Sequence, residues 1–227
     1  NLNCIHFIKT PNNQLPLFNG ATPLNLDQID KYLENFKSDN KNNNLGGLFR
    51  IKHKKNFLLI DIDKPPEKKF SKSYQSGPLS FEFFLDGVKI ITNCGFGKHV
   101  SKKAELLSRL TACQSTLTIN DTSITNFEKN EMINKVFGNS IQNSFKSFDF
   151  SSTNENNLIG CSVSSNGYEK RFGCTHKREI YFDKENSCLK GIDHVFKTKD
   201  GYPIRYAFRF HINPELSAVK TMSGNSA

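Results

Sequence analysis

The segment Leu79-Ser-Phe-Glu-Phe-Phe-Leu85, followed by Asp86-Gly87 and then Val88-Lys-Ile-Ile-Thr-Asn93, decides the fold class. Both runs are short and rich in β-branched and aromatic residues, which pack well on a pleated sheet. An Asp-Gly pair between two such runs is typical of the tight turn that joins antiparallel strands, because both turn residues must adopt positive φ. The segment therefore predicts a β-hairpin.

Similar short runs recur on both sides of this hairpin. They cover residues 48–52, 57–62, 115–120, 158–164, 171–182, 188–197 and 204–212. Turn signals at Asn166-Gly167, residues 183–187 and Asp200-Gly201 separate the later runs. Many short strands with frequent turns favour a mainly β fold, an antiparallel β-sandwich, over a parallel α/β sheet. Residues 126–146 are predicted to be an excursion between strands that is partly helical.

The first forty residues have a different pattern. Leu26, Ile29, Leu33 and Phe36 recur at helical spacing, and Asn25 can cap the first turn, so we expect a helix at about 26–37. The polar stretch that follows, ending at residue 44, has loop composition. We therefore place a module boundary there and expect a sheet domain over 45–227.

Composition and charge exclude two classes of protein. Mean hydropathy is −0.53 and no apolar run approaches the roughly 18 to 20 residues that span a bilayer, so no membrane span is expected. A formal charge of +9 would suit nucleic acid, but the basic residues are mostly Lys, and Arg is the residue whose planar fork matches phosphate. Because no zinc-finger, RRM or basic-zipper pattern accompanies this charge, nucleic-acid binding is not expected.

The six cysteines stand at positions 4, 94, 113, 161, 174 and 188 and form no C-x-x-C pair. This spacing excludes a zinc ribbon. A chain of this length can build its own core, so we expect free thiols rather than a disulfide framework.

Several motifs carry a family resemblance. In order along the chain they are Gly77–Gly87, Ile90–Gly95, Ala112–Thr122, Asn166–Gly173, Leu189–Asp193 and Phe208–Pro214. Together they resemble the β-sandwich of heparinase II/III-like proteins, in particular the alphaproteobacterial branch. Leu17–Thr22 and the helix after it resemble the end of the α/α toroid that precedes that sandwich. The resemblance implies that residues 1–44 are the end of the toroid with its linker, and that 45–227 are a sandwich truncated at its C-terminus.

The resemblance also implies a chemistry, β-elimination on a uronic-acid polysaccharide. Such a reaction needs a base for the C5 proton, a donor for the departing O4 and a group that neutralises the carboxylate. In the family these tasks fall mostly to an Asn, a Tyr and a His of the toroid, upstream of residue 1. We therefore expect no catalytic residue in this chain, partnership with the toroid of its own parent protein, and a periplasmic or cell-envelope location.

Some relatives bind zinc through the sandwich, and the matching positions here hold Gln75, Asn93 and Gln114. Amides are poor zinc ligands compared with imidazole or carboxylate. We therefore predict no metal site and no cofactor. The three amides are candidate substrate-binding residues, and the alternative is that they are satisfied polar residues that pack an interface.

The last predicted strand suggests a cationic face. Alternation places four apolar residues on a core face and four others opposite: Arg205, Ala207, Arg209 and His211. The apolar set is Tyr206, Phe208, Phe210 and Ile212. His176 and Arg178 share a parity in an earlier strand, and pairing of the two strands would create a patch suited to carboxylate or sulfate. A solvated face, or buried partners such as Glu82 and Asp193, would explain these residues equally well.

These observations lead to one function and one alternative. The first is the C-terminal domain of a heparinase II/III-like polysaccharide lyase that acts on an acidic polysaccharide and is inactive without its toroid. The alternative is a non-catalytic carbohydrate-binding or scaffold sandwich that has lost the metal and catalytic positions.

Overall fold

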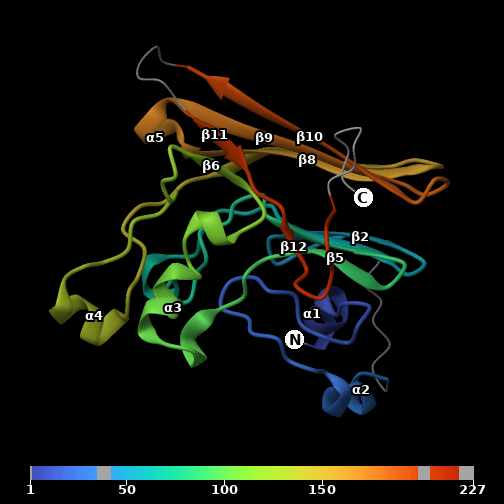
Figure 1. Ribbon diagram of the computed structural model, residues 1–227, viewed down its shortest axis with the longest axis horizontal. Helices are drawn as coiled ribbons and strands as arrows, with labels where there is room; N and C mark the ends of the chain where they lie inside the picture. Colours follow the sequence, from blue (N-terminus) through green and yellow to red (C-terminus); the bar gives the residue numbers. More distant parts are fainter. Residues whose placement is uncertain (1, 35–41, 199–204, 220–227) are drawn as a thin grey trace.

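The computed structural model describes residues 2–34, 42–198 and 205–219, which form two main antiparallel sheets and one small one (Figure 1). The six-stranded sheet has the order β1-β2-β3-β4-β5-β12. Its strands are β1 (Asn44–Leu45), β2 (Leu48–His53), β3 (Asn56–Asp61), β4 (Phe81–Leu85), β5 (Val88–Thr92) and β12 (His211–Ile212). The predicted mainly β, antiparallel fold is thereby confirmed.

The other two sheets complete the β structure. The four-stranded sheet, in the order β10-β9-β8-β7, contains β7 (Ser147–Asn154), β8 (Leu158–Tyr168), β9 (Cys174–Asp183) and β10 (Cys188–Lys197). The small sheet pairs β6 (Leu117–Ile119) with β11 (Tyr206–Phe208). The α-helices are short: α1 (Leu2–Ile8), α2 (Asp27–Glu34), α3 (Lys102–Leu107), α4 (Glu131–Phe137) and α5 (Glu169–Phe172). The described residues also form the 3-10 turns η1 (Lys68–Phe70), η2 (Gly97–His99) and η3 (Thr111–Cys113).

The hairpin predicted around Asp86-Gly87 is present. Leu85 lies opposite Val88, and the two turn residues have φ values of 49° and 86°. Positive φ at both positions is what a two-residue hairpin turn requires, and glycine takes it without steric cost. The turn therefore sets the register of β4 and β5.

The inward faces of the two main sheets form the largest core. Phe49, Ile51, Leu58, Ile60, Phe81 and Phe83 of the six-stranded sheet pack against Ile159, Cys161, Val163, Ile180 and Phe182 of the four-stranded sheet. Burial alternates along β9, as expected for a strand with one face in the core. This packing is that of a sandwich.

The N-terminal segment covers the second face of the six-stranded sheet. Phe7 and Phe18 pack against Phe57, Leu59 and Phe84, all nearly fully buried. In Figure 1, α1 and α2 lie on the side of this sheet opposite β8–β10. Because both faces of the sheet are covered, β3 is buried along its whole length.

The predicted N-terminal helix is present as α2, and the Asn25 side chain accepts a hydrogen bond of 2.9 Å from the Asp27 N–H, as a cap does. Residues 35–37 of the prediction lie outside the described residues. The predicted partly helical excursion over 126–146 contains α4. Across the described ranges, no helix has the length and apolar character needed to cross a bilayer.

The predicted final strand over 204–212 is wrong in its continuity and in its core face. The segment forms two short strands, because β11 pairs with β6 while β12 pairs with β5. The apolar residues assigned to the core are instead 39% to 49% exposed: Tyr206, Phe208, Phe210 and Ile212. The segment crosses from one sheet to another, so neither sheet covers that row completely.

Two further strand boundaries differ from the predictions. Asn166-Gly167 is not a turn between strands but lies within β8, at a register shift against β9. The run over 171–182 begins in α5, and its strand starts at Cys174. The hairpin over 183–187 is confirmed, and Asp200-Gly201 lies outside the described residues.

Candidate functional site

Arg178 lies at the junction of the three sheets and is 2% exposed. Its Nε and Nη2 donate to the two carboxylate oxygens of Asp193, at 2.7 and 3.0 Å. Its Nη1 donates to the carbonyl oxygens of Leu79 and Ser115, at 2.7 and 2.8 Å. The two-pronged contact and the two carbonyls satisfy a guanidinium that is removed from water.

His176 shares the Asp193 carboxylate, with 2.7 Å between His176 Nε2 and Oδ1. Burial raises the pKa of Asp193, but hydrogen bonds from His176 and Arg178 outweigh it and hold that pKa well below its ordinary value. Burial lowers the pKa of His176 despite this bond. Asp193 is thus the partner of the two basic side chains, as the alternative interpretation of this strand expected.

The strand that carries His176 and Arg178 does not pair with the final strand. β9 lies between β8 and β10, whereas the final segment pairs with β6 and β5. The hypothesis of a patch formed by direct strand pairing is therefore wrong. The two segments meet through side chains, with the rings of His176 and Phe208 5.9 Å apart.

The amides of Gln75 and Gln114 are brought together at a backbone carbonyl. Both Nε2 atoms donate to the Ser108 carbonyl oxygen, at 3.0 and 2.9 Å, and Gln75 Nε2 also donates to Gly95 O at 2.8 Å. Gln75 Oε1 accepts from the Gly20 N–H at 3.1 Å, which links the N-terminal segment to the sandwich. Both side chains are at most 2% exposed.

Asn93, 1% exposed, completes the set, and its Oδ1 accepts from the Ser115 N–H at 2.9 Å. Amide groups already bonded to the backbone do not fit the zinc that the resemblance implies for some relatives. Among the described residues, no group of three or more His, Cys, Asp or Glu is placed to hold a metal ion. A role for Gln75, Asn93 and Gln114 in substrate binding stays a prediction.

Two of the remaining candidate residues, Arg205 and Arg209, pair with Asp121, and the third is His211. Arg205 forms an ion pair with Asp121, and its side chain is 72% exposed. Arg209, 35% exposed, donates to Asp121 Oδ1 at 3.2 Å and to Thr118 Oγ1 at 3.3 Å. His211 is half-buried, with Nε2 3.1 Å from the Ala112 carbonyl oxygen. Arg205 and Arg209 are therefore the candidates best placed to meet a ligand from solvent.

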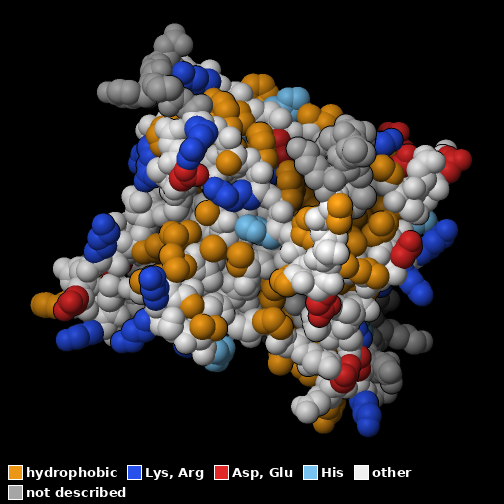
Figure 2. All heavy atoms as spheres, viewed as in Figure 1, with side chains coloured by type: hydrophobic (Ala, Val, Ile, Leu, Met, Phe, Trp, Pro, Cys, Tyr) orange, Lys and Arg blue, Asp and Glu red, His pale blue; other side chains and the backbone are white. Residues whose placement is uncertain are grey.

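Charged and hydrophobic side chains are interspersed on one face of the molecule (Figure 2). Figure 2 shows hydrophobic side chains in several patches on this face, with Lys and Arg side chains spread singly around them. No continuous basic track is seen on the face shown.

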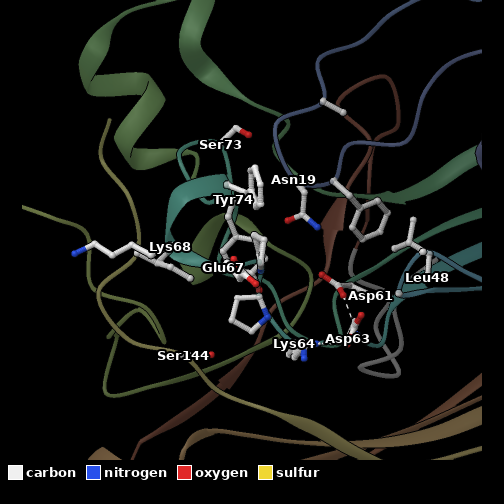
Figure 3. A pocket seen from close by; sticks show the side chains of 18 of the residues that line it. Asn19, Leu48, Asp61, Asp63, Lys64, Glu67, Lys68, Ser73, Tyr74 and Ser144 are labelled. Atoms are coloured by element: carbon white, nitrogen blue, oxygen red, sulfur yellow. Dashed lines mark hydrogen bonds between the residues drawn. The ribbon is translucent and has the colours of Figure 1, made fainter. Parts of the chain in front are cut away.

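A cleft of about 790 Å³ opens between the N-terminal segment and the sandwich (Figure 3). Its polar wall includes Asn19, Asp61, Asp63 and Tyr74, and Asn19 lies between Tyr74 and Asp61 in this view. The volume is in the range of small-molecule sites. This cleft has no signal in the sequence, because its walls come from segments far apart in the chain.

Two buried polar groups line this cleft, a carboxyl group with a raised pKa and a hydroxyl group without a hydrogen-bond partner in the described part of the chain. Burial raises the pKa of Asp61 to about 7, against hydrogen bonds from the Asp63 backbone and the Asn19 side chain. The Tyr74 hydroxyl is buried without a hydrogen-bond partner among the described residues, and burial together with the charges of Asp61 and Asp63 raises its pKa. A buried hydroxyl group without a partner is uncommon in folded proteins.

Arg109 is a second buried arginine that sequence analysis missed. It is fully buried, and its guanidinium donates to the carbonyl oxygens of Tyr74, Asn139 and Ser71 at 2.9, 2.6 and 2.8 Å. Burial lowers its pKa to about 10. These hydrogen bonds connect residues 126–146, which contain α4, to the segment around Tyr74. No local pattern marks this residue, because its hydrogen-bond partners are backbone atoms distant in sequence and the ring it stacks on, Phe127, is 18 residues away.

Replacing Arg178 by Ala should destabilise the protein by about 3 to 5 kcal/mol, because it leaves the Asp193 carboxylate, whose side chain is only 14% exposed, partly unpaired. Arg178→Lys should recover only part of this loss, since an ammonium cannot make the two-pronged contact. Urea unfolding measures both. Arg205→Ala, which removes an exposed ion pair, is the control and should have little effect. A loss for Arg178→Ala no larger than for the control would contradict the assigned role.

Asp61 should make the protein less stable as pH rises. Its folded-state pKa, about 7, lies above its ordinary value of 3.8, so the folded state binds the proton more tightly. Its stabilising proton is fully bound below about pH 4 and lost as pH rises through 7. Asp61→Asn should therefore gain about 2 to 3 kcal/mol over the original protein between pH 5 and pH 8, measured by urea unfolding. An identical pH dependence for the two proteins would refute this assignment.

Comparison with known proteins places this geometry in a family. The family model described as "Heparinase II/III-like, C-terminal" matches residues 37–227. The heparan sulfate lyase HepC from Pedobacter heparinus is similar over 97% of this chain and 35% of its own, with a TM-score of 0.69 and 16% identity. The heparinase III BT4657 gene product matches over 95% of this chain and 34% of its own, with a TM-score of 0.69 and 14% identity.

Another heparinase III structure gives a TM-score of 0.66 at 14% identity, over 96% of this chain and 37% of its own. No curated protein sequence matches the chain. The chain spans about a third of the length of these solved structures, and at such identities their likeness shows the fold. Because the family match covers most of its residues, the chain belongs to the heparinase II/III-like family and carries that family's C-terminal domain.

Proposed function

We propose that the chain is the C-terminal part of a polysaccharide lyase that cleaves a uronic-acid-containing polysaccharide by β-elimination. One observation carries the proposal: the family match over residues 37–227. The fold shared with a heparan sulfate lyase over nearly the whole chain supports it.

In this proposal the chain contributes binding and architecture rather than the proton transfers. The base and the proton donor lie on the helical toroid upstream, which is the chain's main partner. Residues 1–44 are the end of that toroid with its linker, and 45–227 are the sandwich. A periplasmic or cell-envelope location belongs to the same proposal.

The guanidinium groups of Arg205, which is exposed, and Arg209, which is partly exposed, are the proposed contacts to the polymer. A guanidinium holds carboxylate or sulfate through two parallel hydrogen bonds. Both guanidinium groups form ion pairs with Asp121 in the absence of glycan, so an acidic glycan would compete with the Asp121 carboxylate. The net charge of +9 favours encounter with a polyanion.

A non-catalytic carbohydrate-binding or scaffold sandwich is the second candidate. The observation that favours it is the state of Gln75, Asn93 and Gln114, which are buried and bonded to the backbone. In that case the parent protein would hold a glycan without cleaving it.

Activity of the full-length protein separates the two candidates. We expect the full-length protein, incubated with heparin, heparan sulfate, hyaluronan or alginate, to raise the ultraviolet absorbance of a newly formed 4,5-unsaturated uronate with at least one of them. Residues 1–227 alone should give no rise. Elimination by this chain alone would show that its catalytic residues lie within residues 1–227 and not on the toroid, which contradicts the proposal. A full-length protein that binds glycan without cleaving it would favour the scaffold.

Arg209→Ala should weaken binding of the glycan that the full-length protein cleaves or binds in that experiment. The expected loss is about 1.5 to 3 kcal/mol, the range for a hydrogen bond to a charged group. Arg209→Lys should recover part of the affinity, because it keeps the charge and loses the two-pronged contact. Glycan titration by calorimetry measures the affinity of each variant.

The control for Arg209 is Lys170→Ala, which removes an exposed charge on α5 and should leave affinity nearly unchanged. Thermal melts of the same proteins test for a purely structural role. A lowered melting temperature with unchanged affinity would show that Arg209 only pairs with Asp121 and Thr118.

A further inference from the structure

Two cysteines lie next to each other where two loops meet. Cys94 follows β5, and Cys113 ends the 3-10 turn η3. The Cys94 N–H donates to the Cys113 carbonyl oxygen at 3.0 Å, and the thiols are near enough for each to shift the pKa of the other. With standard bond lengths, one backbone hydrogen bond of this length keeps the two Cα atoms roughly 5 to 6 Å apart, within the 4.4 to 6.8 Å that a disulfide spans.

This pair is also accessible. Cys94 is exposed and Cys113 is half-buried, whereas Cys161 and Cys174 are buried at 1% exposure. All six cysteines are free thiols in the structure. A small oxidant can therefore reach Cys94 and Cys113 without opening the core.

The environment of Cys113 favours its thiolate. A hydrogen bond from Cys94 and the charge of Arg209 lower the pKa of Cys113 to about 7, against the effect of burial. The same hydrogen bond and burial raise the pKa of Cys94. Because the thiolate is the nucleophile, Cys113 is the thiol that attacks first.

We propose that Cys94 and Cys113 form a reversible disulfide, with a small disulfide such as oxidised glutathione, or the disulfide of an oxidoreductase, as the oxidant. The Cys113 thiolate attacks one sulfur of the oxidant and expels one glutathione thiolate, which leaves a mixed disulfide. The Cys94 thiol then loses its proton, attacks the Cys113 sulfur and expels the second glutathione. The two cysteines are oxidised by two electrons, and the glutathione disulfide is reduced to two thiols.

The disulfide would link covalently the two loops that carry Asn93 and Gln114. Cys94 directly follows Asn93, and Cys113 directly precedes Gln114. Asn93 already accepts from Ser115, and Gln114 already donates to Ser108. Oxidation would therefore replace a junction held by hydrogen bonds with a covalent one. The inference concerns the thiols themselves and is independent of the proposed lyase function.

Glutathione titration tests the proposal. The chain is equilibrated in buffers of increasing oxidised-to-reduced glutathione ratio, remaining thiols are alkylated, and peptides are mapped by mass spectrometry. We expect a cross-linked peptide joining Cys94 to Cys113, with the loss of two hydrogen atoms, reversed by reduced glutathione. Cys188→Ser, which removes an exposed cysteine elsewhere, should leave this cross-link unchanged.

Single-thiol variants test the order of the steps. Cys94→Ser should accumulate a glutathione adduct on Cys113, because the resolving thiol is missing. Cys113→Ser should react with oxidised glutathione roughly tenfold more slowly at pH 7, since the remaining thiol is mostly protonated. Full alkylation of both thiols in strongly oxidising buffer, a stable Cys113 adduct in the unsubstituted protein, or cross-links to other cysteines would overturn the proposal.

Discussion

The guanidinium of Arg178 is buried where the three sheets meet, and taking it out of water costs several kcal/mol unless its donors are satisfied. Asp193 supplies both carboxylate oxygens from the neighbouring strand β10. Leu79 and Ser115 supply carbonyls from the segments that lead into β4 and β6. Removing any one sheet would leave this charge unsatisfied, so the arrangement of the sheets and the burial of Arg178 depend on each other.

Leu79 illustrates how tightly this junction is specified. Its φ is 58°, a left-handed conformation that is unfavourable for a bulky residue. Its side chain is fully buried in the core between the sheets, its N–H bonds to Asp61, and its carbonyl accepts from Arg178. The conformation that costs energy locally is the one that aims the carbonyl at the guanidinium, and the surrounding contacts hold it there.

Local pattern predicted the hairpin, most strands and the helix at α2, because turn chemistry and alternation act over a few residues. Alternation also grouped His176 with Arg178 correctly on one face of β9. It could not say which face is buried, since a cationic face is normally solvated. That face points inward here because Asp193 and two carbonyls compensate its charge, and those partners lie in other segments.

The other features of the fold and of the candidate site depend on residues that are distant in the sequence, which no local pattern reveals. Phe7 and Phe18 cover a sheet that begins far along the chain, and Asp61 appears in sequence only as the end of an apolar strand. The three amides were identified by resemblance, and their contacts with Ser108, Ser115 and Gly20 depend on how loops fold over one another. For the same reason, alternation predicts a single final strand, whereas the segment pairs with two sheets.

The way the final segment is paired bears on the order of folding. Strands β7 to β10 follow one another and pair as neighbours, so each closes a short loop and can form early. By contrast, β11 and β12 pair with β6 and β5, strands far upstream. The loop that they close contains all four strands of this meander, β7 to β10. We therefore expect the meander to fold first and the segment 205–213 to dock last, which makes that docking the slow step.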